Sequence, residues 1–221
     1  MSAYARPPID APLIRDSEGN VIDFGRRWSG HPPEELYSVD AYPERFAPIH
    51  TIADALITHL RDAYEVEVTE GAHLAADLLH PAVDVVRAVR LRPVDPRCAP
   101  LTFVCTGYPG VVLHAGLLHD FHHPVCGCEA CDSTWESEAD DLERHVLAVA
   151  SGHYRETIDR GISAGVGYAF TFPDGTSSGR SRARDMPAAR LRAAKPILRA
   201  LPDGWAPWPR AAGTAPSAHA D

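Results

Sequence analysis

The sequence has little of what marks several familiar classes of protein. It holds one lysine, Lys195, among 21 basic residues, and its formal net charge at neutral pH is −9. A general nucleic-acid-binding protein needs a surplus of basic side chains to face phosphates, so we expect no nucleic-acid partner. The scarcity of lysine beside abundant arginine, alanine and proline indicates a coding bias rather than a functional choice.

Long apolar runs are also missing. No stretch approaches the roughly 20 apolar residues that span a bilayer. The first residues, MSAYARPPIDAP, lack the basic and then apolar pattern of a signal peptide. We therefore expect a cytoplasmic protein with no membrane partner.

Established catalytic and phosphate-binding motifs are absent as well. Neither glycine-rich phosphate loop occurs, and no HExxH or zinc-deaminase signature accompanies the cysteines. Residues 161–165, GISAG, match the G-x-S-x-G pattern of a nucleophile elbow around Ser163. That elbow needs a helix after it, but VGYAFTF reads as a strand, and the only later histidine is His219. A turn between strands explains the motif better than a serine hydrolase does.

What the chain does contain predicts one α+β domain. Its 221 residues and 45% hydrophobic content suit a single sizeable core. Proline and glycine are frequent in residues 1–42, which we interpret as an extended arm with a possible hairpin at residues 17–20. Residues 43–208 form the predicted domain, and residues 209–221 a disordered tail.

Apolar periodicity predicts helices after Pro48, over about 134–151 and over about 186–201. Short segments rich in β-branched residues predict strands, namely YEVEV, VDVVRAVRLRPV, LTFVCTGY, VVLHAGLL, HYRETI and GVGYAFTF. TSSGRSRARD reads as a polar linker. Because most strands follow one another without crossover helices, we expect an antiparallel sheet packed against about three helices.

The strongest chemical signal is the run HHPVCGCEACDSTWE, which places Cys126, Cys128 and Cys131 within six residues. Thiolates are good zinc ligands, and this spacing is typical of a tight chelating loop. Gly127 would let the backbone turn sharply between two ligands. Ser133 and Glu136 fit a capping box, so a helix should start beside the loop, and its positive end favours thiolate over thiol.

Three sulfurs leave one tetrahedral position for another ligand. The candidates near in sequence are His114, His119, His122, His123 and Asp132. We favour His119, which lies seven residues before Cys126, a distance that a turn can fold back on. Two other readings of the cluster stay open, namely free thiols and a disulfide from Cys131 to Cys126 or to Cys128.

Four segments together resemble a known family. These are HPPEELYSVDAYPERFAPIHTIADALI, PGVVLHAGLLHDF, CGCEACD and GWAPWPR. They are similar to an actinobacterial family described only as a domain of unknown function, and the likeness spans most of residues 5–210. CGCEACD, with its CGCxxCD motif, is the most specific of the four. The resemblance implies a single domain and supplies no activity.

These observations favour a non-enzymatic binding or accessory protein whose zinc ion is structural. The alternative is an enzyme that uses the sulfur cluster, either around a metal with an open position or as a thiol redox centre.

Overall fold

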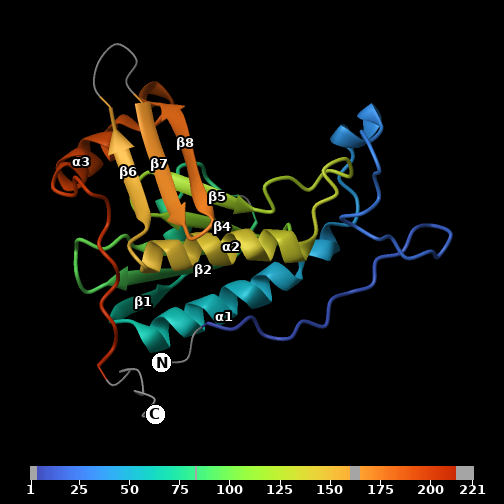
Figure 1. Cartoon of the computed structure of the whole chain (residues 1–221), viewed down its shortest axis with the longest axis horizontal. Helices are drawn as coiled ribbons and strands as arrows, with labels where there is room; N and C mark the ends of the chain where they lie inside the picture. Colours follow the sequence, from blue (N-terminus) through green and yellow to red (C-terminus); the bar gives the residue numbers. More distant parts are fainter. Residues whose placement is uncertain (1–3, 83, 160–164, 213–221) are drawn as a thin grey trace.

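The computed structural model describes residues 4–82, 84–159 and 165–212. Two antiparallel sheets and three α-helices make up the fold (Figure 1). The α+β antiparallel prediction is therefore confirmed, with the difference that the strands divide into two sheets rather than one. None of the helices in these residues combines the length and apolar character needed to cross a membrane.

The larger sheet is a five-stranded meander in the order β1–β2–β3–β4–β5. Its strands are β1 (Val66–Glu70), β2 (Val85–Pro93), β3 (Leu101–Thr106), β4 (Gly110–Ala115) and β5 (His119–His123). The smaller sheet contains β6 (Tyr154–Ile158), β7 (Gly165–Phe172) and β8 (Gly175–Arg182). The helices are α1 (Pro48–Ala63), α2 (Trp135–Ala150) and α3 (Ala188–Arg199).

The helices α1 and α2 lie side by side against one face of the larger sheet (Figure 1). Pro48 occupies the first turn of α1, as predicted, where its missing N–H is harmless. The predicted apolar stripes are buried, and they include Ile49, Ile52, Leu56 and Leu60 of α1 and Ala139, Leu142, Val146 and Val149 of α2. They join the inward side chains of both sheets in one core.

Two strands differ from the sequence-based expectation. β8 occupies a segment that was expected to be a linker. Its sequence did not predict a strand because its serines and arginines are exposed and show no alternation of apolar and polar residues. β5 was not predicted, since HDFHH is polar, yet its side chains alternate between buried and less buried positions. β5 is an edge of the larger sheet, and the loop after it carries the cysteines.

The described parts of the two terminal segments form backbone contacts of their own. The predicted hairpin is a single antiparallel bridge between Arg15 and Val21. Residues 209–211, assigned to the tail from the sequence, instead hydrogen-bond to the end of α1 and the residues after it. Residues 213–221 and the GISAG serine, Ser163, lie outside the described residues.

Candidate metal centre

The three clustered cysteines come together in the loop between β5 and α2. Their sulfur atoms lie within 4.8 Å of one another, and all three are free thiols. On a tetrahedral zinc with bonds of about 2.3 Å, sulfurs are about 3.8 Å apart, so a small closure of the loop reaches that geometry. Cys128 is buried and Cys131 is exposed. The donor set therefore fits zinc, with one side of the cluster open to solvent.

Hydrogen bonds within the loop act on the thiols. Burial tends to raise the pKa of the Cys128 thiol, but bonds from the Cys131 and Ala130 backbone and from neighbouring thiols lower it overall. The pKa of the Cys131 thiol is raised to about 12, chiefly by its hydrogen bonds to Cys128 and Cys126. The loop therefore favours the thiolate form more at Cys128 than at Cys131.

The helix after the loop begins one residue later than the predicted capping box. Thr134 is the N-cap, its side chain accepts from the Ser137 backbone N–H, and the Ser137 side chain accepts from Thr134. The prediction that Ser133 and Glu136 form the capping box is therefore wrong. Thr134 and Ser137 form it instead, since the short Ser137 side chain reaches back to the N-cap as a glutamate would. The N–H groups that reach the sulfurs belong to the loop rather than to the helix.

Two arginines hold the loop, the half-buried Arg27 of the N-terminal arm and the buried Arg45 just after the arm. Arg45 is 4% exposed. It donates to the carbonyl oxygens of Gly127 at 2.7 Å and Ser133 at 3.3 Å, and it lies 3.3 Å from the Glu129 carboxylate. Arg27 pairs with both Glu129 and Asp132 and also donates to the Glu129 carbonyl. Figure 1 shows the blue segment of the arm beside this loop.

The charges of this network balance among themselves. Arg27 and Arg45 supply two positive charges, and Glu129 and Asp132 supply two negative charges. Both guanidinium groups contact the ring of Phe24, and their central carbons lie 4.3 Å and 4.4 Å from its centroid. A set of three thiolates would therefore require a counter-charge of its own, and metal binding deprotonates thiols and supplies one.

Gly127 is required for a reason other than the predicted sharp turn. Its φ is not among the positive values of the described glycines. A Cβ at this position would instead overlap the hydroxyl of Tyr108, which donates to Asp40 at 3.1 Å. The glycine thus allows the loop to approach the β3–β4 turn closely.

The predicted fourth ligand, His119, is placed elsewhere. The group of ligand atoms found in the described residues holds the three sulfurs and does not include His119. Its Nδ1 lies 2.9 Å from the buried carboxylate of Glu156, and its ring packs against Tyr168 and Phe121. His114, another candidate, lies 2.6 Å from Asp120. The structure brings the cysteines together and does not bring these histidines to them.

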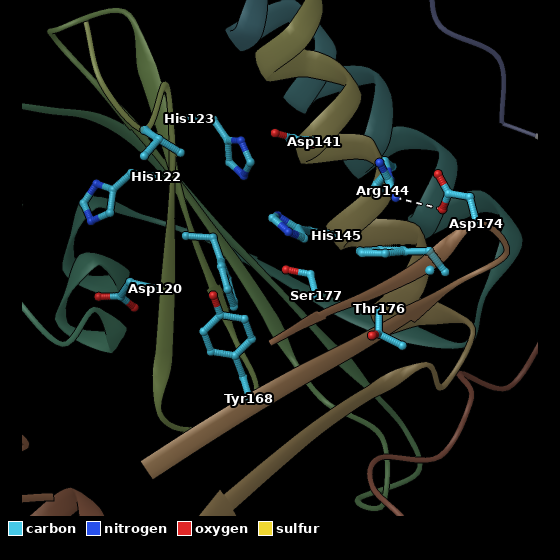
Figure 2. A pocket seen from close by; sticks show the side chains of 14 residues that line it. Asp120, His122, His123, Asp141, Arg144, His145, Tyr168, Asp174, Thr176 and Ser177 are labelled. Atoms are coloured by element: carbon cyan, nitrogen blue, oxygen red, sulfur yellow. Dashed lines mark hydrogen bonds and ion pairs between the residues drawn. The ribbon is translucent and has the colours of Figure 1, made fainter. Parts of the chain in front are cut away.

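A cavity of about 590 Å³ lies between β5, α2 and the β7–β8 hairpin. Figure 2 shows His123 of β5 and His145 of α2 converging on it, with Tyr168 and Ser177 on its other side. The two imidazole centroids are 5.5 Å apart. Burial lowers the pKa of His123 to about 3 and that of His145 to about 4, so both rings are neutral near pH 7.

Sequence reasoning missed this pair. His145 had no partner at ligand spacing on its own helix, and His123 was considered only as a zinc ligand. The two residues are brought together by the pairing of β5 with β4 and by the packing of α2 on both sheets. No local pattern signals such a meeting, because it depends on the register of an unpredicted strand.

Comparison with known protein families finds one family model that matches most of the chain. A family model described as "Family of unknown function (DUF6226)" matches residues 10–212. The chain belongs to this family. The match covers most of the arm, the cysteine loop and both sheets. No curated protein and no solved structure shows significant similarity to the chain.

Proposed function

We propose that this family member is a non-enzymatic binding or accessory protein of the cytoplasm, in which a zinc ion on Cys126, Cys128 and Cys131 fastens the N-terminal arm to the α+β domain. The observation that supports the proposal is that the three sulfurs converge in a loop to which the arm is hydrogen-bonded and ion-paired. Besides the arginine contacts, the backbone N–H groups of Glu129 and Ala130 donate to carbonyls of Val39 and Leu36, at 2.8 Å and 3.2 Å.

Zinc would act here by cross-linking the loop rather than by chemistry. Metal ligation would fix three residues of a loop that is otherwise held by ion pairs and hydrogen bonds, and the free energy of metal binding to the folded form would add to its stability. The loop in turn holds the arm. His119, the fourth ligand predicted from the sequence, would have to give up its bond with Glu156 to reach the sulfurs.

The test compares the wild-type chain with Cys128→Ser, which removes a buried ligand. Cys98→Ser is the matched control, because Cys98 is a buried thiol outside the cluster whose bond to the Pro207 carbonyl a hydroxyl can replace. Metal content, thermal melting with and without a chelator, and hydrogen exchange at the Glu129 and Ala130 amides are measured. We expect only wild type and Cys98→Ser to hold zinc and to lose amide protection when it is removed.

A protein that holds stoichiometric zinc but melts at the same temperature without it would contradict the structural role. Unchanged protection at Glu129 and Ala130 after zinc removal would show that the metal does not fasten the arm.

The exposed Cys131 thiol supports a second candidate, a metal- or thiol-dependent enzyme. With three ligands from the described residues, a bound zinc keeps a position for water or substrate, as catalytic sites do. This candidate requires exchangeable water on the bound metal, or rapid alkylation of at least one of the three cluster thiols near neutral pH in the metal-free protein. Slow alkylation together with a metal that exchanges no water would exclude it.

A further inference from the structure

The cavity between β5, α2 and β7–β8 contains polar atoms that the protein leaves without partners. His123 is 2% exposed, and neither of its ring nitrogens has a hydrogen-bond partner in the protein. The nearest carboxylate oxygen, on Glu138, is 3.9 Å from Nδ1 and accepts instead from the Val125 backbone. Nδ1 of His145 is likewise buried and unpartnered. Buried polar atoms are normally hydrogen-bonded, but these three nitrogens, on two residues that line the cavity, lack partners among the described residues.

The walls of the cavity are aromatic. Phe121 lies edge-on to Tyr168, with centroids 4.9 Å apart, and it also faces the His145 ring at 4.9 Å. Phe172 is 6.3 Å from His145, and the Arg144 guanidinium covers its ring at 4.4 Å. Such walls favour a flat ring, which offset and edge-on contacts stabilise.

The charges at the rim argue against an anion. Arg144, the cationic side chain among the described lining residues, is paired with Asp174 at 2.9 Å and stacks on Phe172. Asp141 adds a second carboxylate beside His145 (Figure 2). Both interior histidines are neutral, so no unpaired positive charge among these residues faces a phosphate or a carboxylate.

A metal ion fits less well than an organic molecule. Histidine, cysteine and carboxylate groups able to hold a metal, with three ligand atoms within 4.8 Å, were found in the described residues only at the cysteine loop. A neutral imidazole presents one donor and one acceptor, whichever tautomer is present. Two such rings therefore match a molecule that carries donors and acceptors along one edge.

We propose that this cavity binds a neutral, planar heteroaromatic molecule with a hydrogen-bond donor and an acceptor on the same edge, as nucleobases and pyridine carboxamides have. The ring lies against Phe121, Tyr168 and Phe172, and its polar edge faces His123 and His145. The volume of about 590 Å³ suits a small ligand of this kind. None of the three cysteines lines this cavity, although Val125, the residue before Cys126, does. The proposed ligand contacts do not involve the cysteines.

The test is calorimetric titration of the full chain near neutral pH with adenine, cytosine and nicotinamide as probes, and with the benzoate anion as a comparison. We expect at least one neutral probe to bind and benzoate not to bind. In His145→Phe, which keeps the ring and removes both nitrogens, binding should weaken by about tenfold or more, the worth of one good hydrogen bond in a dry site. His59→Phe, outside the cavity, is the control.

Imidazole ¹⁵N spectra of the wild-type chain provide a readout that needs no variant. The bound probe should shift the His123 and His145 nitrogens and leave those of His59 in place. The proposal is overturned if every probe has a dissociation constant above about 1 mM. Equal binding of benzoate, or unchanged binding by His145→Phe, also overturns it. If Zn²⁺ added beyond the content of the cysteine loop shifts these nitrogens instead, the cavity is a metal site and the proposal is wrong.

Discussion

Replacing Arg45 tests how much the buried arginine that follows the arm stabilises the cysteine loop. Arg45→Met keeps much of the side chain's length and removes the guanidinium that donates to Gly127 and Ser133 and pairs with Glu129. Removing one partner of a buried ion pair typically costs about 3–5 kcal/mol. Arg27 still holds the Glu129 carboxylate. The loss should therefore fall near the lower end, about 3 kcal/mol.

The assay is equilibrium unfolding by denaturant at a fixed zinc concentration, followed by thermal melting. For a chain of this size, about 3 kcal/mol corresponds to a fall of roughly 6–12 °C in the melting temperature. Arg61→Met is the control, because the Arg61–Asp62 pair is exposed and such pairs contribute about 1 kcal/mol or less. A loss in Arg45→Met no larger than that in Arg61→Met would refute the reasoning.

Three further outcomes follow from single contacts. Gly127→Ala should destabilise the chain by about 1–3 kcal/mol because its Cβ overlaps the Tyr108 hydroxyl, and adding Tyr108→Phe should recover part of the loss in denaturant unfolding. The folded-state pKa values of His123 and His145, about 3 and about 4, lie below the unfolded value near 6.5. Between about pH 4 and 6.5 the unfolded chain therefore binds more protons than the folded chain. The contribution of the two histidines to the free energy of unfolding is complete above about pH 6.5 and is lost as the pH falls toward about 4. Denaturant unfolding across this pH range should show the decrease, and His145→Phe should make it smaller. Glu156→Gln should lower the free energy of unfolding by about 2–3 kcal/mol. The buried Glu156 carboxylate accepts from the Leu117 and Leu118 backbone, the Trp205 indole and the His119 ring, whereas the glutamine amide has one oxygen acceptor. A change within about 0.5 kcal/mol, the usual range for a neutral surface substitution, would contradict this.

Elements with a strong local period were predictable. The apolar stripe of α1 predicts both its helix and its buried face, and β-branched runs predict β2, β3 and β4. In α1, β3 and β4 the residues that signal the element also form the core, whereas in β2 Val89 and Leu91 are buried and Val86 is 66% exposed. β5 and β8 lack that signal because their side chains are polar, and their pairing is determined by neighbouring strands rather than by their own composition.

The cysteine cluster was visible from its spacing, but its surroundings were not. Arg27 and Arg45 reach Glu129 across 102 and 84 residues of sequence, and no local pattern relates either arginine to the loop. The same holds for His123 and His145, which meet only after two sheets have packed on α2. His119 was chosen for its nearness in sequence. It lies instead at the start of β5, a strand that was not predicted, and there its ring hydrogen-bonds to Glu156.

The central claim is that the three thiols are metal ligands, and metal content tests it most directly. The measurement is inductively coupled plasma mass spectrometry on protein purified without a histidine tag, together with a titration of free thiols. We expect about one zinc per wild-type chain, none in Cys128→Ser, and the full amount in Cys98→Ser. A folded, metal-free wild-type protein whose cluster thiols all titrate as free, even after zinc is supplied, would contradict the account.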